Sequence, residues 1–145
     1  MHVAYFDLET TGISTRSEIV QIAVETENGD KFNQYVFPLS HYIPLDAQTI
    51  HGMSIVDNEL CKDGEILPDV VLPSKAFEEF KHFLENLRQS DQEKIVLCAH
   101  NGLCFDSKVL IYNLVKRNEL TMPANVEFRD SLDILKKYRD LIGSV

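Results

Sequence analysis

An apolar run near the start of the chain leads directly into two acidic residues that stand one position apart. Val3 to Phe6 is apolar and β-prone, which predicts a buried strand, and Asp7 and Glu9 follow it. Because side chains alternate along extended backbone, both carboxylates point to the same face. Like charges on one face repel, and a divalent cation is the simplest compensation. This stretch therefore predicts a strand end that collects negative charge.

The remaining pattern predicts an α/β domain with a mixed sheet. Two strand-like segments, 19–26 and 31–37, are joined through Asn28-Gly29, a strong hairpin signal. Residues 38–73 contain four prolines, which predicts a long irregular segment with short helical turns. The elements expected beyond it are a helix capped by Ser74 with an apolar stripe over residues 76–87, a buried strand over 95–98, a helix over 103–117, a strand over 125–128 and a helix capped by Asp130 or Ser131.

The totals favour one intracellular domain over residues 1–145. The chain has 14 Lys and Arg against 23 Asp and Glu, a formal net charge of −9, which argues against a nonspecific duplex binder with a basic face. An enzyme that holds a short stretch of nucleic acid through metal ions remains compatible with this charge. The three cysteines form no CxxC pair, which fits a reduced, intracellular protein. We expect neither a signal peptide nor a membrane span.

A third acid, Asp106, follows the buried strand expected over 95–98. Strands of an α/β sheet bring their carboxyl ends to one edge, so Asp106 is expected to converge with Asp7 and Glu9. Such clustered carboxylates suit Mg²⁺ or Mn²⁺, and two ions would serve phosphodiester hydrolysis. Equally open is a reading in which Asp106 only caps a helix and Glu9 is a solvated turn residue.

Two longer motifs carry a family resemblance. FDLETTG (6–12) and AHNGLCFD (99–106) resemble the first and second motifs of the DEDD superfamily of 3′→5′ exonucleases. That ribonuclease-H-like group includes polymerase proofreading subunits and three-prime repair exonucleases. SEIVQIAV (17–24) is similar to its second strand, and AQTIHGMS (47–54) to an Ile-His-Gly segment beyond the third strand. The resemblance implies a ribonuclease-H-like mixed sheet with flanking helices and release of nucleoside monophosphates from the 3′ end of DNA or RNA.

The resemblance also implies roles for individual residues. Asp7 and Glu9 would ligate metal, with Asp7 bridging two Mg²⁺ or Mn²⁺ ions, and Asp106 would hold the second ion. Plain core packing stays an alternative for Leu8, and a structural loop histidine for His51. The expected substrate-binding residues are Leu8, Thr10, Thr11 and Gly12 at the terminal nucleotide, and Ile50, His51 and Asn101 around the last two nucleotides.

A haloacid dehalogenase type of phosphatase is a weaker alternative. Those enzymes place a nucleophilic Asp after the first strand and a second Asp two positions later, where this chain has Glu9. They also need a late acidic pair, and no such pair follows Asp106.

The third motif of the DEDD family is absent from this sequence. That motif carries a His or Tyr as general base and an Asp five residues later, but no His follows His100. His100 itself is expected to hydrogen-bond locally. We therefore expect a C-terminally truncated domain, without its catalytic helix, that is incomplete or inactive as an isolated exonuclease. The alternative is a noncatalytic nucleic-acid- or protein-binding module. Expected partners are single-stranded or 3′-end DNA or RNA, and a second copy or the remainder of a longer chain.

Overall fold

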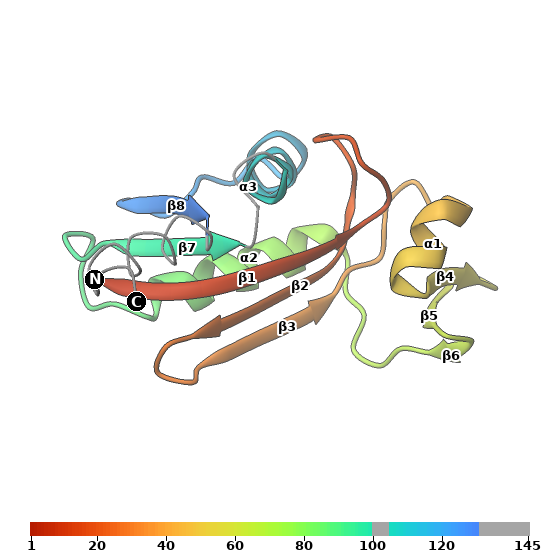
Figure 1. Ribbon diagram of the computed structural model, residues 1–145, viewed down its shortest axis with the longest axis horizontal. Helices are drawn as coiled ribbons and strands as arrows, with labels where there is room; N and C mark the ends of the chain where they lie inside the picture. Colours follow the sequence, from red (N-terminus) through yellow and green to blue (C-terminus); the bar gives the residue numbers. More distant parts are fainter. Residues whose placement is uncertain (100–104, 131–145) are drawn as a thin grey trace, which may run out of the picture.

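A mixed five-stranded sheet forms the centre of the protein in the computed structural model, which describes residues 1–99 and 105–130 (Figure 1). The strand order is β3-β2-β1-β7-β8. β2 runs antiparallel to both of its neighbours, whereas β1, β7 and β8 are parallel to one another. This arrangement confirms the predicted α/β class and the ribonuclease-H-like mixed sheet. The five strands are β1 (His2–Thr10), β2 (Ile19–Thr26), β3 (Lys31–Tyr35), β7 (Ile95–Ala99) and β8 (Val126–Asp130).

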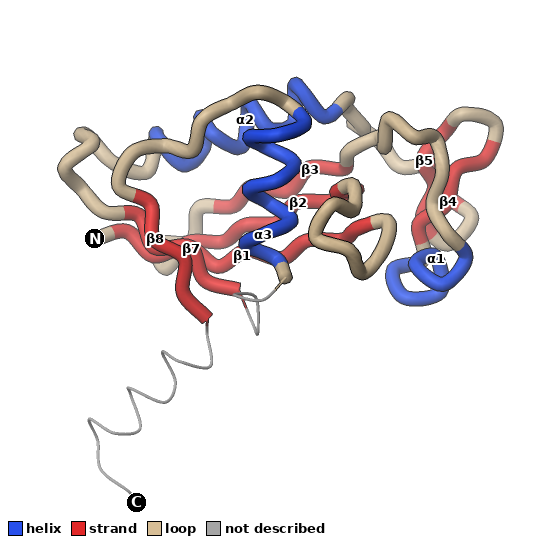
Figure 2. The backbone as a smooth tube through the Cα atoms, turned by 90° about the horizontal axis from the view of Figure 1, so that it is seen from above, coloured by secondary structure: helices blue, strands red, loops and turns tan. Residues whose placement is uncertain are grey.

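Helices cover one face of this sheet. Figure 2 shows α2 (Pro73–Glu85) and α3 (Asp106–Ile111) on the same side, and α3 continues into a π-helix, η1 (Tyr112–Arg117). The predicted apolar stripe of α2 is confirmed, but the helix begins at Pro73 because the fixed φ of proline suits a first helical position. The main buried side chains between helices and sheet are Phe6, Leu8, Ile22, Val24, Phe77, Phe80, Leu84, Leu97, Val109, Leu110 and Leu114.

Side chains of β1 alternate between the two faces of the sheet. Ala4, Phe6 and Leu8 are buried beneath the helices, and Asp7 and Glu9 take the intervening positions. The shared face that period-two geometry predicts for the two carboxylates is therefore the face away from the helices.

β1 is longer than the predicted strand, which ended at Phe6. Its pairing with β2 continues to Thr10 opposite Ile19, with a register shift after Glu9. The hydrogen bonds of β2 keep the backbone extended beyond the apolar run, so both acids lie within the strand rather than after it.

The prediction for residues 38–73 was right about a short helical element but wrong about the strands, because the segment is not irregular throughout. This segment contains α1 (Leu45–His51) and a second, antiparallel sheet of three strands. Tight turns with positive φ at Asp57, Asn58 and Gly64 connect these strands, so residues typical of loops mark hairpin turns here. The strands are β4 (Met53–Val56), β5 (Glu59–Lys62) and β6 (Glu65–Ile66), and their small core holds Val20, Ile43, Ala47, Met53 and Leu60.

Two expectations near the C-terminal part also change. The helix expected over 103–117 is divided into α3 and η1 within the described residues. The strand expected over 125–128 is β8, which pairing with Ala99 of β7 extends to the buried Asp130, and the cap expected at Asp130 or Ser131 depends on a helix outside the described residues. Among residues 1–99 and 105–130, no helix is long and apolar enough to cross a membrane.

Candidate functional site

Three predicted carboxylates influence one another at one end of the sheet. Burial raises the pKa of Asp106, the first residue of α3, to about 6, and repulsion from Asp7 and Glu9 adds to the rise. Burial also raises the pKa of Glu9, with a further contribution from Asp7. The three side chains therefore lie close enough for their negative charges to repel one another.

This carboxylate group does not have the geometry of a formed metal centre. Within residues 1–99 and 105–130, no three His, Cys, Asp or Glu side chains make a group that could hold one metal ion. The donor chemistry nevertheless fits a hard divalent cation, because carboxylate oxygens are its preferred ligands and a positive charge would offset the repulsion that raises the pKa values of Glu9 and Asp106. Asp7, Glu9 and Asp106 therefore supply ligands of the right chemistry for such an ion, although their side chains are not arranged in the described residues as a group that could hold it.

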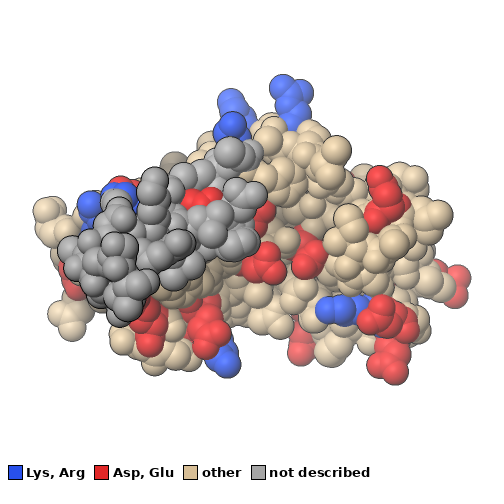
Figure 3. Space-filling view, in the orientation of Figure 1, with Lys and Arg blue, Asp and Glu red and all other residues tan. Residues whose placement is uncertain are grey.

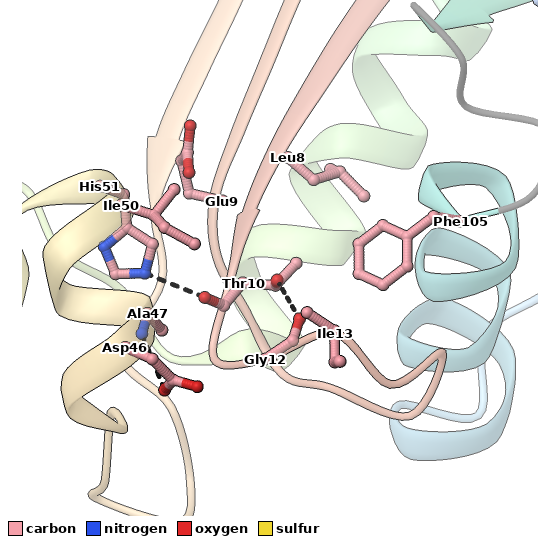
Figure 4. Close-up of a pocket in the computed structure, with 10 residues that line it drawn as sticks. All are labelled: Leu8, Glu9, Thr10, Gly12, Ile13, Asp46, Ala47, Ile50, His51 and Phe105. Carbon is pink, nitrogen blue, oxygen red and sulfur yellow. Dashed lines mark hydrogen bonds between the residues drawn. The ribbon is translucent and has the colours of Figure 1, made fainter.

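An apolar cavity of about 290 Å³ opens beside Glu9. Figure 4 shows Leu8 and Phe105 facing each other on one side of it, with Ile50 and His51 on the other. Asp7 instead borders a shallow hollow on the sheet surface near Ala23. The cavity is lined by Leu8, Glu9, Thr10, Gly12, Ile13, Asp46, Ala47, Ile50, His51 and Phe105.

His51 connects the wall of this cavity to the end of β1. The backbone N–H of Met53 donates to its Nδ1 at 3.1 Å, so the proton of the neutral ring is on Nε2. Nε2 then donates to the carbonyl oxygen of Thr10 at 2.9 Å. The side chain is 9% exposed and both ring nitrogens are occupied. His51 thus has the structural role left open from the sequence, and it lines the cavity as well.

Side-chain hydrogen bonds close the loop that follows β1. Thr11 and Glu18 bond reciprocally: the Thr11 N–H donates to the Glu18 carbonyl at 2.9 Å, and the Glu18 N–H donates to Thr11 Oγ1 at 3.0 Å. Thr10 Oγ1 donates to the Gly12 carbonyl at 2.8 Å. These contacts hold Gly12 at the cavity, whereas Thr11 stands behind its wall and is not among the lining residues.

Most of the predicted substrate-binding residues meet at this cavity. Leu8 belongs both to the cavity wall and to the core, at 7% exposure. Asn101 and His100 lie outside the described residues. Sequence reasoning missed four lining residues. The sequence contained a signal for two of them: Ile13 is an apolar residue in a polar loop, and Phe105 is an aromatic residue beside a candidate metal ligand. It contained no signal for Asp46 and Ala47.

The fold and the carboxylates beside the apolar cavity define a ribonuclease-H-like domain that resembles the DEDD exonucleases. Residues 1–136 match the family model of the Exuperantia RNase H-like domain, and the chain belongs to that family. The resemblance expected from the motifs is thereby confirmed.

The chain is also similar to individual proteins. The chain is 29% identical over 133 residues to the exonuclease DPD1, chloroplastic/mitochondrial, of Arabidopsis thaliana. The match covers 90% of this chain but 39% of that protein, so the chain spans less than half of its relative. Among solved structures, the family B DNA polymerase of Pyrobaculum calidifontis has a TM-score of 0.51 at 13% identity, over 94% of this chain and 16% of the polymerase. Exonuclease X in complex with 5′-overhanging duplex DNA has a TM-score of 0.47 at 20% identity, over 99% of this chain and 66% of that one.

Proposed function

We propose that this chain is a metal-dependent exonuclease domain that removes nucleotides from the 3′ end of DNA or RNA. The observation that carries the proposal is the raised pKa of Asp106, caused by burial and by Asp7 and Glu9, next to an apolar cavity. Catalytic sites concentrate such perturbed carboxylates where chemistry requires them. The kinship with a plant protein named as an exonuclease supports the same reading.

The described residues would have two roles: carboxylates would bind metal ions, and apolar side chains would contact a terminal base. Asp7, Glu9 and Asp106 would hold Mg²⁺ or Mn²⁺, and the ions would supply the charge stabilisation that phosphodiester hydrolysis needs. Leu8 and Ile50 offer apolar surface for a terminal base, and such contacts tolerate any sequence. A site of this kind recognises the end of a strand, not its bases.

Turnover by this chain should be slow. Since no His follows His100 in this sequence, the family's water-activating His is not supplied here, and general-base catalysis contributes roughly 10²- to 10⁴-fold. Self-association, completion by a longer chain and an intracellular location stay predictions. The plant relative's name places that protein in chloroplasts and mitochondria.

One observation favours a noncatalytic binding module as the second candidate. Within residues 1–99 and 105–130, the carboxylates do not assemble into a group that could hold one metal ion. A module of this kind would keep the apolar cavity for binding and use no metal.

The test is degradation of 5′-labelled single-stranded and 3′-recessed DNA and RNA in Mg²⁺ or Mn²⁺. The wild-type chain is compared with Asp7→Asn and with Asp30→Asn, a matched charge change at an exposed carboxylate in the β2–β3 turn. Stepwise shortening from the 3′ end that only Asp7→Asn abolishes would support the exonuclease. No shortening, but Mn²⁺-dependent thermal stabilisation lost in Asp7→Asn, would support a metal site without turnover. Neither effect, together with measurable oligonucleotide binding, would support the module.

A further inference from the structure

Arg16, in the loop after β1, and Arg117, the last residue of η1, both lie over the ring of Tyr112, and these three residues are called the ridge. The guanidinium carbon of Arg16 stands 5.9 Å from the centroid of the Tyr112 ring, and that of Arg117 stands 5.4 Å from the same centroid. Each cation is attracted to the aromatic ring, but the two positive groups repel each other. Two cations held over one ring therefore form a place where an anion would be favoured.

Hydrogen bonds hold this group in position. Arg117 donates from its guanidinium to the Arg16 carbonyl at 2.6 Å. The buried side-chain amide of Asn113 donates to the Ser17 carbonyl at 2.8 Å. The loop after β1 is thus fastened to η1, a π-helix, and π-helical turns are frequent at functional sites. These bonds fix the Arg117 guanidinium and the backbone at Arg16, whereas the Arg16 guanidinium is positioned by its contact with the Tyr112 ring.

The two arginines also lack the acidic neighbours that other arginines have. Arg88 and Arg129 pair with Asp91 and with Glu127 respectively. In the described part of the chain, Arg16 and Arg117 take part in none of the ion pairs.

Positive side chains occur at the edge of the molecule where α3 lies, as they do at its left and lower edges (Figure 3). Figure 3 shows Lys and Arg side chains projecting from the edge where α3 lies, whereas Asp and Glu side chains are scattered below it. The chain has a net charge of −9, yet the two arginines at the ridge carry positive charge that none of the ion pairs among the described residues neutralises. This charge is well suited to phosphate, because Arg offers several N–H donors in a planar fork.

The same two segments reach the cavity at their other ends. The loop that ends near Arg16 begins with Gly12 and Ile13, and α3 begins beside Phe105; all three residues line the cavity. The 6 residues of α3 rise about 9 Å, so Tyr112 stands about that far from Asp106 along the helix. A stacked strand advances about 3.4 Å per nucleotide, so a strand ending in the cavity would bring its phosphates to the ridge about three nucleotides from its end.

We propose that Arg16, Tyr112 and Arg117 bind the phosphodiester backbone of a single strand whose 3′ end occupies the cavity. This proposal rests on the function proposed above. It assigns the arginine pair to positioning, since phosphate contacts fix the register of a strand without reading its sequence.

The test compares long and short ligands. Fluorescence polarisation measures binding of labelled oligo(dT) and oligo(U), each as a long strand and as a dinucleotide, in Ca²⁺ and at several salt concentrations. Arg16→Gln is the main variant because its side chain donates none of the hydrogen bonds that fasten the loop. Lys75→Gln, an equal charge loss on exposed α2, is the matched control, and Tyr112→Leu removes the shared ring.

The expected result is a loss confined to the long strands. Arg16→Gln should weaken their binding about three- to tenfold and lower the slope of log affinity against log salt by about 1, with dinucleotide binding and Lys75→Gln unchanged. Unchanged long-strand binding in both Arg16→Gln and Tyr112→Leu would overturn the inference and leave the proposed function standing. An equal loss for dinucleotides would also overturn it, because the effect would then come from the cavity. Absence of binding by the wild-type chain would overturn both proposals.

Discussion

Replacing Asp106 by Asn should stabilise the chain at neutral pH and have little effect at acid pH. In the folded chain, burial and repulsion by Asp7 and Glu9 raise the pKa of Asp106 from 3.8 to about 6. In the unfolded chain an Asp titrates near its ordinary value, about 3.9. The ionised form is therefore the one that folding disfavours, and Asn removes that charge while keeping nearly the same shape.

The sign and the size follow from proton linkage. A carboxyl group whose pKa is raised on folding contributes most to stability below about pH 4, and that contribution is lost as the pH rises through about 6. At 1.36 kcal/mol per pKa unit the full shift corresponds to about 3 kcal/mol. The carboxyl is partly exposed, so screening by solvent reduces this to about 1–2 kcal/mol. For a chain of this length, that predicts a rise in melting temperature of about 3–6 °C at pH 7.5.

Thermal unfolding of wild type, Asp106→Asn and the exposed control Asp30→Asn at pH 4 and pH 7.5 tests this reasoning. The stabilisation by Asn should appear only at pH 7.5 and only at position 106. Added Mg²⁺ should narrow the difference by stabilising the wild type, because an ion bound by the folded chain shifts the unfolding equilibrium. The electrostatic account fails if Asp106→Asn changes the melting temperature equally at both pH values, or lowers it at pH 7.5.

Three further predictions concern the cavity and its supports. Gly52→Ala should destabilise the chain by about 1–2 kcal/mol or more in chemical denaturation, because Gly52 has a φ of +75° and a Cβ there would collide with the Asp63 carboxylate; an unchanged midpoint would contradict this. His51→Ala should cost about 2–3 kcal/mol by the same measurement, because it removes two hydrogen bonds and leaves a buried N–H without its acceptor, and a cost under half a kcal/mol would argue against the link to β1. Ile13→Asp and Ile50→Asp, at 92% and 78% exposure, should leave the melting temperature within about 2 °C but weaken oligonucleotide binding at least severalfold, since the apolar surface offered to a base is lost; equal binding would exclude these walls from the site.

The local sequence pattern was sufficient to predict those strands and turns whose burial or backbone conformation follows directly from neighbouring residues. The alternation around Asp7 and Glu9 and the unbroken apolar run at 95–99 each report burial directly. The Asn28-Gly29 signal between β2 and β3 worked because the turn needs a positive φ, and Gly29 has one of 90°. Each of these signals depends on residues that are neighbours in sequence.

Prediction from local pattern failed for the strands within residues 38–73. Short strands separated by Asp, Asn and Gly resemble a loop when each is read alone, and they become a sheet only by pairing with one another and packing on Val20 of β2. The double role of His51 was equally invisible, because its second partner, Thr10, is 41 positions away.

The sequence by itself determined the class of the sheet, the three candidate carboxylates and most of the cavity, because alternation and motif spacing are local properties. The tertiary structure alone decided how strongly the pKa of Asp106 is raised, that Asp46 and Ala47 join the cavity wall, and that Arg16 and Arg117 share one aromatic ring. The physical reason is the same in each case. Burial, repulsion and stacking depend on distances between residues that are far apart along the chain, and only folding sets those distances.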